Sequence, residues 1–393
     1  MHLTRGLRAI AIALLSGVLS ACGSAAPTAH ALGTISSGAS TQRSPSSSPG
    51  SSPRPSPKPS RAQAKLPTAG NPNGRAAVPA DARAVDTSHP THVVGNGTAA
   101  SCTSQAVVAA VGAGGVITFS CGAAPVTITM KTTAKIRNTS AQVVLDGGGR
   151  VTLSGGGARR ILYMNTCDQA QGSMGGSCIQ QDRPRLTLQN LTFADANATG
   201  QRVAAGGGGI GGGGAVFAYG GRLTVINSRF VRGRCDATGP DLGGAAIRIV
   251  YEPHPATIVS STFGGAPGQG GVCANGGALS SLHASWTVLN SVLSYNSAIG
   301  RGANPARAGT PGGGSGGAVY CDGDRFTLRI AGSIIENNHA NEGGGAVFFV
   351  SNDRTGTLGI QGSQLRHNIS GKFETSGFPG IFFLGAGRPQ VSS

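Results

Sequence analysis

Few residues of this chain are spaced so that they could do chemistry together. The densest group is Asp322, Asp324 and Arg325, between Tyr320 and Phe326. Residues i and i+2 of a strand share a face, so the two carboxylates could jointly bind Ca²⁺ or act as acid and base on an acidic sugar chain. The alternative is a turn between two strands, because Asp and Gly both favour turns.

A second and sparser group consists of Glu336, His339 and Glu342, for which a solvated turn is the alternative. There is no Cys-x-x-Cys or clustered His–Cys spacing in the sequence, so we expect no zinc site. The glycine run Gly206–Gly214 lacks the Lys-Ser/Thr that completes a phosphate-binding loop. The motifs therefore predict no cofactor, with Ca²⁺ as the one metal left open.

The first cysteine follows a short apolar segment at the amino terminus. Arg5 and Arg8 precede the apolar stretch Ala9–Val18, and Leu19-Ser20-Ala21-Cys22 matches the bacterial lipobox. We interpret residues 1–22 as a lipoprotein signal peptide and Cys22 as the lipidation site, which predicts a cell-membrane protein anchored by lipid on the extracytoplasmic side. The alternative is an ordinary secretory signal with an incidental cysteine.

Seven cysteines remain in a chain predicted to be exported, where disulfides persist. Cys102 and Cys121 flank a short predicted helix, Cys167 and Cys178 enclose a polar loop, and Cys235 and Cys273 occupy the same connection of consecutive repeats. We predict these three disulfides and leave Cys321 as a buried thiol. Seven cysteines also allow other connectivities.

Residues 23–92 are predicted to form a disordered linker, because Ser44–Arg61 is a Pro/Ser run with no apolar residue to bury. The folded domain is expected over residues 93–393. The net charge of +16 favours anionic partners such as wall polymers, acidic polysaccharide or lipid headgroups. Nucleic acid is not expected as a partner, since export removes it and aromatic residues make up only 5% of the chain.

The elements that must position these residues come from a repeat of about 30 residues. Gly-Gly-Ala recurs, and a short apolar strand, a turn and a second strand follow each copy. The parity of the apolar residues changes at Asn227, which predicts a coil corner there, and Asn290, Gly332 and Gly362 hold the equivalent position. The copies of Gly-Gly-Ala begin at Gly213, Gly243, Gly276, Gly316 and Gly344; the second strands begin at Leu186, Leu223, Ala256, Trp286, Leu328 and Leu358.

One such coil cannot bury its apolar face alone, so the repeat predicts an all-β solenoid, a right-handed parallel β-helix with a short amino-terminal capping helix near Cys102–Gly112. The right hand is a fold-level expectation. The varying repeat length lies in one connection per coil, which predicts a ridge of insertions on one face. A β-propeller is the alternative, but its blades need about 40 or more residues.

The repeats resemble those of chlamydial polymorphic membrane proteins, which pair Gly-Gly-Ala-aliphatic with Phe-x-x-Asn. The second motif occurs here in relaxed form, ending at Asn296, Asn338 and Asn368. More broadly, the chain is similar to the pectate-lyase-like β-helix superfamily. The resemblance implies a β-helix fold, and the polymorphic membrane proteins are linked to adhesion.

Two functions follow as hypotheses. The first is a surface-anchored protein that binds cell-wall or extracellular carbohydrate, or a surface protein, through the ridge without catalysis. The second is a polysaccharide lyase or glycoside hydrolase acting on acidic polysaccharide, with Asp322, Asp324 and Arg325 as candidate catalytic residues.

Overall fold

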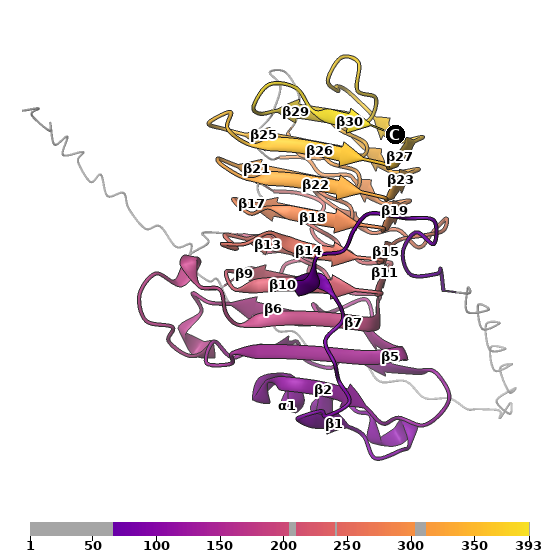
Figure 1. Ribbon diagram of the computed structural model, residues 1–393, viewed down its shortest axis with the longest axis vertical. Helices are drawn as coiled ribbons and strands as arrows, with labels where there is room; N and C mark the ends of the chain where they lie inside the picture. Colours follow the sequence, from indigo (N-terminus) through magenta and orange to yellow (C-terminus); the bar gives the residue numbers. More distant parts are fainter. Residues whose placement is uncertain (1–65, 204–209, 240–241, 303–311, 393) are drawn as a thin grey trace, which may run out of the picture. The chain divides into compact units, whose positions relative to one another are not determined.

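Stacked parallel strands make up most of the chain in the computed structural model, which describes residues 66–203, 210–239, 242–302 and 312–392. The coils follow one another from α1 at one end to β29 and β30 at the other (Figure 1). The predicted signal peptide, Cys22 and the linker up to residue 65 lie outside the described residues. The predicted all-β parallel β-helix is confirmed, whereas its right hand stays a prediction.

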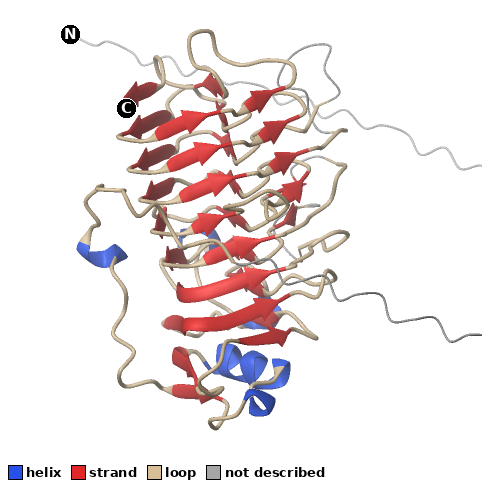
Figure 2. Cartoon of the chain, turned by 90° about the vertical axis from the view of Figure 1, so that its right-hand side faces the viewer, coloured by secondary structure: helices blue, strands red, loops and turns tan. Residues whose placement is uncertain are grey.

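From β9 onward, each full coil places one strand in an eight-stranded sheet and two in a sixteen-stranded sheet, whereas the long strands β5 and β7 each take the place of two (Figure 2). The eight-stranded sheet contains β4 (Ala134–Lys135), β6 (Leu162–Asn165), β9 (Val216–Tyr219), β13 (Ile247–Val250), β17 (Leu279–Leu282), β21 (Val319–Gly323), β25 (Val347–Ser351) and β29 (Ile381–Leu384). The sixteen-stranded sheet contains β1 (His92–Val94), β2 (Gly115–Phe119), β3 (Val126–Thr129), β5 (Gln142–Ser154), β7 (Arg185–Ala194), β10 (Arg222–Ile226), β11 (Arg229–Val231), β14 (Ala256–Val259), β15 (Thr262–Phe263), β18 (Trp286–Leu289), β19 (Val292–Ser294), β22 (Thr327–Ala331), β23 (Ile334–Glu336), β26 (Thr357–Gln361), β27 (Gln364–Arg366) and β30 (Gln390–Ser392).

Shorter elements complete the coils. A four-stranded sheet contains β16 (Val272–Cys273), β20 (Ser297–Ala298), β24 (His339–Ala340) and β28 (Ile369–Ser370), and a two-stranded sheet contains β8 (Gly211–Gly212) and β12 (Leu242–Gly243). The helices are α1 (Ser104–Ala113) and the 3₁₀ turns η1 (Ala80–Ala82), η2 (Ala99–Ser101), η3 (Gln169–Gln171) and η4 (Cys178–Gln180).

The strand register confirms the predicted alignment of the second strands. Leu223 pairs with Leu186, and Trp286 pairs with both Ala256 and Leu328. Asn227 has φ 45° and lies at the corner between β10 and β11, where Asn tolerates the left-handed conformation. Asn290, Gly332 and Gly362 repeat this conformation in later coils, with φ values of 50°, 60° and 52°.

One repeat was aligned wrongly from the sequence. Val216 pairs with Ile247, so Gly213-Gly214-Ala215 corresponds to Gly244-Ala245-Ala246 and not to Gly243-Gly244-Ala245. The first position of the motif needs glycine because its φ is positive, 63° at Gly213 and 73° at Gly244. A Cβ on Gly244 would also lie only 2.1 Å from the carbonyl oxygen of Ile247.

Buried polar residues stack in the interior beside the apolar core. The three Asn residues of the relaxed motif form a ladder, in which Asn296 Nδ2 donates to Asn338 Oδ1 at 3.0 Å and Asn338 Nδ2 donates to Asn368 Oδ1 at 2.9 Å. Asn338 Nδ2 also donates to the Leu293 carbonyl at 2.9 Å. The recurring Asn therefore satisfies buried backbone groups at a coil corner.

The amino-terminal end is capped as predicted. Thr103 begins α1 by accepting the Ala106 N–H at 3.2 Å, and Val107 and Val111 of α1 are buried against the first coils. The Cys102–Cys121 disulfide joins this cap to the end of β2. A cap of this kind shields the apolar interior that an open coil end would expose.

The segment from Leu66 to Thr87, here called the strap, lies along the outer face of the sixteen-stranded sheet (Figures 1 and 2). Asn290 binds both backbone groups of Ala76, at 2.8 and 2.9 Å, and Gln189 does the same for Val85, at 2.9 and 3.0 Å. The linker was predicted over residues 23–92, so contact with the β-helix begins earlier in the chain than expected. An apolar row lies beneath the strap, consisting of Ile226, Val259, Leu289 and Ala331, with Ala76, Val78 and Ala82 above it.

Candidate functional site

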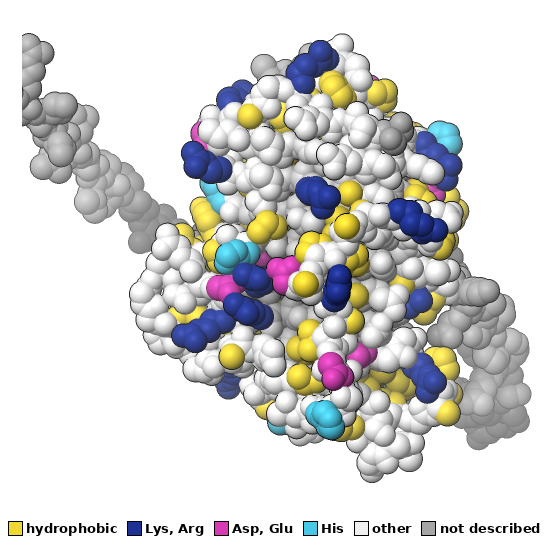
Figure 3. All heavy atoms as spheres, in the orientation of Figure 1, with side chains coloured by type: hydrophobic (Ala, Val, Ile, Leu, Met, Phe, Trp, Pro, Cys, Tyr) yellow, Lys and Arg dark blue, Asp and Glu magenta, His cyan; other side chains and the backbone are white. Residues whose placement is uncertain are grey.

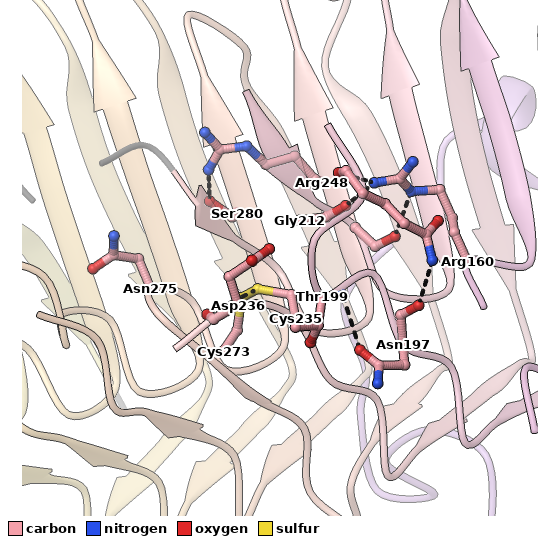
Figure 4. Close-up of a disulfide and its surroundings, with 12 residues drawn as sticks. Arg160, Asn197, Thr199, Gly212, Cys235, Asp236, Arg248, Cys273, Asn275 and Ser280 are labelled. Atoms are coloured by element: carbon pink, nitrogen blue, oxygen red, sulfur yellow. Dashed lines mark hydrogen bonds between the residues drawn. A yellow bond between two sulfur atoms is a disulfide. The ribbon is translucent and has the colours of Figure 1, made fainter. Parts of the chain in front are cut away.

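The three predicted disulfides are present, and Cys321 is a buried free thiol. Cys235 and Cys273 follow the paired residues Arg234 and Val272, so stacking alone brings them together. Figure 4 shows this disulfide beside the buried Arg160, which donates to the Gly212 carbonyl at 2.8 Å. Burial lowers the pKa of Arg160 to about 10. These groups hold the connections of successive coils in place.

The predicted ridge is only partly correct. The connections that lead from the second strand of one coil to the next strand of the eight-stranded sheet differ in length, as expected, and two of them meet where the Gly239 N–H donates to the Arg301 carbonyl at 3.1 Å. However, the insertion in residues 264–271 precedes β16, whereas that in residues 299–315 follows β20. The insertions therefore leave the coil at two positions. The glycine run Gly206–Gly214 belongs partly to this region, but residues 204–209 lie outside the described residues.

The two predicted acidic residues have different hydrogen-bond and ion-pair partners. Asp322 lies in β21, and its carboxylate accepts the Tyr320 hydroxyl at 3.2 Å. Asp324 follows the strand, is exposed, and has its carboxylate 3.8 Å from Nδ1 of His283. Arg325 is exposed on the same turn. Among the described residues, no group of three or more His, Cys, Asp and Glu side chains could hold a metal ion.

The second predicted group is also dispersed. Glu336 forms an ion pair with Arg366 of the next coil. Glu342 is only 3% exposed, and its Oε1 accepts the Gly312 N–H at 3.0 Å. His339 lies half-buried in β24. These side chains therefore serve separate contacts within the coils.

A different set of charged residues gathers where strands of the eight-stranded sheet lead into the sixteen-stranded sheet. We call Asp182, Arg185, Arg222 and His254 the Asp182 cluster. Asp182 forms ion pairs with Arg185 and with Arg222 Nε, the latter at 2.8 Å, and lies 3.5 Å from Nε2 of His254. Figure 3 shows basic, acidic and histidine side chains gathered over the start of β10. The cluster therefore joins three segments that are distant in sequence.

Local structure explains why these residues meet. Arg185 and Arg222 begin β7 and β10 and are direct partners in the strand register. Asp182 lies in the short segment between the Cys167–Cys178 disulfide and β7, and this segment is tied to β10 because Arg222 N–H donates to the Pro184 carbonyl at 3.1 Å. His254 lies in the turn between β13 and β14.

Two carboxyl groups in and beside the cluster have pKa values shifted in opposite directions. Burial opposes ionisation of Asp182, but hydrogen bonds and charge from Arg185 and Arg222 outweigh it and lower the pKa of Asp182. Glu252, two residues before His254, is only 5% exposed, and burial raises its pKa well above the usual range. Arg222 interacts electrostatically with both. Asp182 therefore ionises more readily than an isolated carboxyl group, and Glu252 less readily.

An open hollow of about 460 Å³ adjoins the cluster. Asp182, Arg183 and Arg185 form one part of its lining, and Ala141, Gln142 and Gln181 form the rest. The Arg185 side chain is 59% exposed, so its guanidinium is accessible although it is paired with Asp182. An open site of this size, lined by two guanidinium groups, is suited to an anionic group on a larger molecule.

The sequence interpretation missed this site entirely. One signal was available, because Arg185 and Arg222 immediately precede the aligned second strands that begin at Leu186 and Leu223. Nothing in the sequence placed Asp182 or His254 beside them, since both lie in irregular loops.

Comparisons with known proteins identify no relative: no family model matches the chain, and neither a curated protein nor a solved structure matches it. The resemblance to polymorphic membrane proteins and to the pectate-lyase-like superfamily therefore stays a prediction. None of the helices in the described ranges is long and apolar enough to cross a membrane.

Proposed function

We propose that this chain is an exported, lipid-anchored β-helix protein that binds an anionic extracellular polymer without cleaving it. The observation that carries the proposal is the hollow beside the Asp182 cluster, lined by Arg183 and Arg185. A guanidinium offers a planar fork of donors that matches carboxylate and phosphate geometry. The ligand class is therefore a polymer with carboxylate or phosphate groups, such as a uronic-acid polysaccharide or a phosphate-bearing wall polymer.

The charges around the hollow support an anionic ligand. Arg183, Arg185 and Arg222 contribute three positive charges, and Asp182 and the exposed Asp81 of the strap contribute two negative ones. One positive charge is left over among these five side chains. Burial raises the pKa of Glu252, which disfavours a further negative charge beside them.

Binding can be tested by calorimetry with polygalacturonate and with a poly(glycerol phosphate), using neutral dextran as a control. We expect Arg185→Gln to weaken binding by about tenfold or more, because a hydrogen bond to a charged group contributes about 1.5–3 kcal/mol. Arg234→Gln, an exposed arginine in a different connection, is the matched control for charge. Equal losses in the two variants would mean diffuse attraction and would overturn the site.

The lipid anchor needs a separate experiment, because Cys22 lies outside the described residues. We expect Cys22→Ala to move the protein from the membrane fraction to the soluble extracellular fraction. A Cys22→Ala protein that stays with the membrane would contradict lipidation as its anchor.

The second candidate function is a hydrolase or lyase for acidic polysaccharide. The observation that favours it is that Arg222 interacts with two carboxyl groups whose pKa values are shifted in opposite directions, raised for Glu252 and lowered for Asp182, since acid–base catalysis needs carboxyl groups with separated pKa values. Under this alternative, the protein releases reducing or unsaturated ends from an acidic glycan, and Glu252→Gln abolishes the release. Intact glycan after prolonged incubation would leave binding as the function.

A further inference from the structure

Positive charge is concentrated at the α1 end of the β-helix. Residues 93–160 contain six Lys or Arg residues and one acidic residue, Asp146, whereas residues 312–392 contain six basic and six acidic residues. The net positive charge is therefore higher at the α1 end of the β-helix than at the far end. None of the residues counted here belongs to the Asp182 cluster.

Five of these basic side chains are exposed, and we call them the basic belt: Lys131, Lys135, Arg137, Arg150 and Arg159. Lys135 lies in β4, the end strand of the eight-stranded sheet, and Lys131 and Arg137 flank it in the same coil. Arg150 and Arg159 belong to the next coil, which contains β5 and β6. Neighbouring strands are about 4.8 Å apart, so the belt spans only about 10 Å along the axis.

The belt has little acidic compensation. None of the ion pairs between described residues includes a belt residue. Asp146 is occupied by hydrogen bonds from Thr87, Gln189 and Asn190 at 2.8–2.9 Å. Asp86, on the strap, is the exposed acid near this end, and His89 lies beside it.

The end of the β-helix beyond the belt contains no Lys, Arg, Asp or Glu in α1 or β2. Residues 93–130, which include α1 and β2, contain no Asp, Glu, Lys or Arg. The cap formed by α1, β1 and β2 therefore contributes no acidic side chain that would repel an anionic surface.

We infer that the α1 end of the β-helix docks on the anionic lipid headgroups of the membrane. Polybasic groups gain favourable energy near such a surface and complement its negative potential. The chain between Cys22 and Leu66 can span up to about 150 Å when extended, so an anchor at Cys22 permits this orientation. The inference uses the proposed anchor only to bring the domain to the membrane, and the docking itself is a property of the belt.

The test uses the whole chain carrying Cys22→Ala, so that lipidation plays no part. Sedimentation with phosphatidylcholine vesicles, with and without phosphatidylglycerol, measures the partition coefficient. We expect the triple variant Lys131→Gln/Lys135→Gln/Arg150→Gln to lower partitioning onto phosphatidylglycerol vesicles about 100-fold, since each Lys or Arg at such a surface contributes about fivefold. The basic linker is present in every protein compared, so its contribution cancels when partition coefficients are divided by one another.

The matched control is Arg325→Gln/Arg329→Gln/Lys372→Gln, which removes the same charge from exposed positions far along the β-helix. It should change partitioning less than threefold. Equal effects of the two triple variants, or binding that does not depend on phosphatidylglycerol, would overturn the inference. A belt variant that loses binding to polygalacturonate but not to vesicles would assign the belt to a polymer instead. Thermal unfolding of each variant checks that the fold is retained.

Discussion

Glu252 is the buried carboxyl group whose replacement gives the sharpest test of the site's electrostatics. Its Oε2 accepts the Leu223 N–H at 3.3 Å, and its Oε1 is buried with no hydrogen-bond partner among the described residues. Burial favours the protonated form and raises the pKa above the ordinary value of 4.5. Glu252→Gln keeps the shape and the acceptor for Leu223 but cannot ionise.

The expected effect follows from proton linkage. Between the unfolded and folded pKa values the folded state holds one more proton than the unfolded state, so the stabilisation is complete below about pH 4.5 and is lost as the pH rises through the folded pKa. The wild-type free energy of unfolding therefore falls relative to that of Glu252→Gln by up to about 1.4 kcal/mol per pH unit. The pH at which the difference levels off measures the pKa of Glu252.

The assay is urea unfolding, followed by the fluorescence of the single tryptophan, Trp286, which is fully buried. Wild type and Glu252→Gln are compared at intervals from about pH 4.5 to about pH 8. Glu336→Gln, which removes the half-buried partner of Arg366, controls for loss of a carboxylate. A constant difference between wild type and Glu252→Gln across this range would refute the reasoning, because it would mean that Glu252 ionises as readily in the folded state as in the unfolded chain.

Three further variants test what holds the scaffold together. Asn338→Ala should lower the free energy of unfolding in urea by about 3 kcal/mol, because several buried groups of the ladder lose their partner; a loss no larger than that of Ser333→Ala would contradict this. The double variant Cys235→Ser/Cys273→Ser should lower the free energy of unfolding by about 4 kcal/mol, since this disulfide links residues 38 apart in the sequence. A urea midpoint equal to that of the wild type would contradict this expectation. Asn290→Ala should speed hydrogen exchange of the Ala76 amide but not of the Val85 amide, which is hydrogen-bonded to Gln189. If the exchange rate at Ala76 is the same in the variant and the wild type, Asn290 does not hold the strap.

The coil architecture could be predicted because it is determined by residues close together within each repeat. The change of parity at Asn227 and the small residues at equivalent corners determine which side chains face inward, and the strand register agrees with that alignment. The Gly243 repeat was misaligned because Gly-Gly-Ala matches there one residue too early. Only Gly244 needs the positive φ, and alanine replaces the second glycine in that coil.

The site could not be predicted in the same way because it lies where the repeat is interrupted. Asp182 is positioned by the segment between the Cys167–Cys178 disulfide and β7, and His254 by the turn after β13. Both connections differ in length from the equivalent turns of the neighbouring coils, so the repeat did not predict where these side chains lie. By contrast, Asp322 and Asp324 were singled out for their closeness in sequence, which says little about the direction of their carboxylates.

The register also explains why the cluster is suited to an additional anion. Arg185 and Arg222 are direct partners in neighbouring parallel strands, and like charges about 4.8 Å apart repel each other. Asp182 offsets this repulsion by pairing with both, so the fold itself requires that carboxylate. Arg183 lines the same hollow, yet none of the ion pairs between described residues includes it. The carboxylate already present pairs with the two strand arginines, so under the proposed function Arg183 is the guanidinium that would bind a carboxylate or phosphate of the ligand.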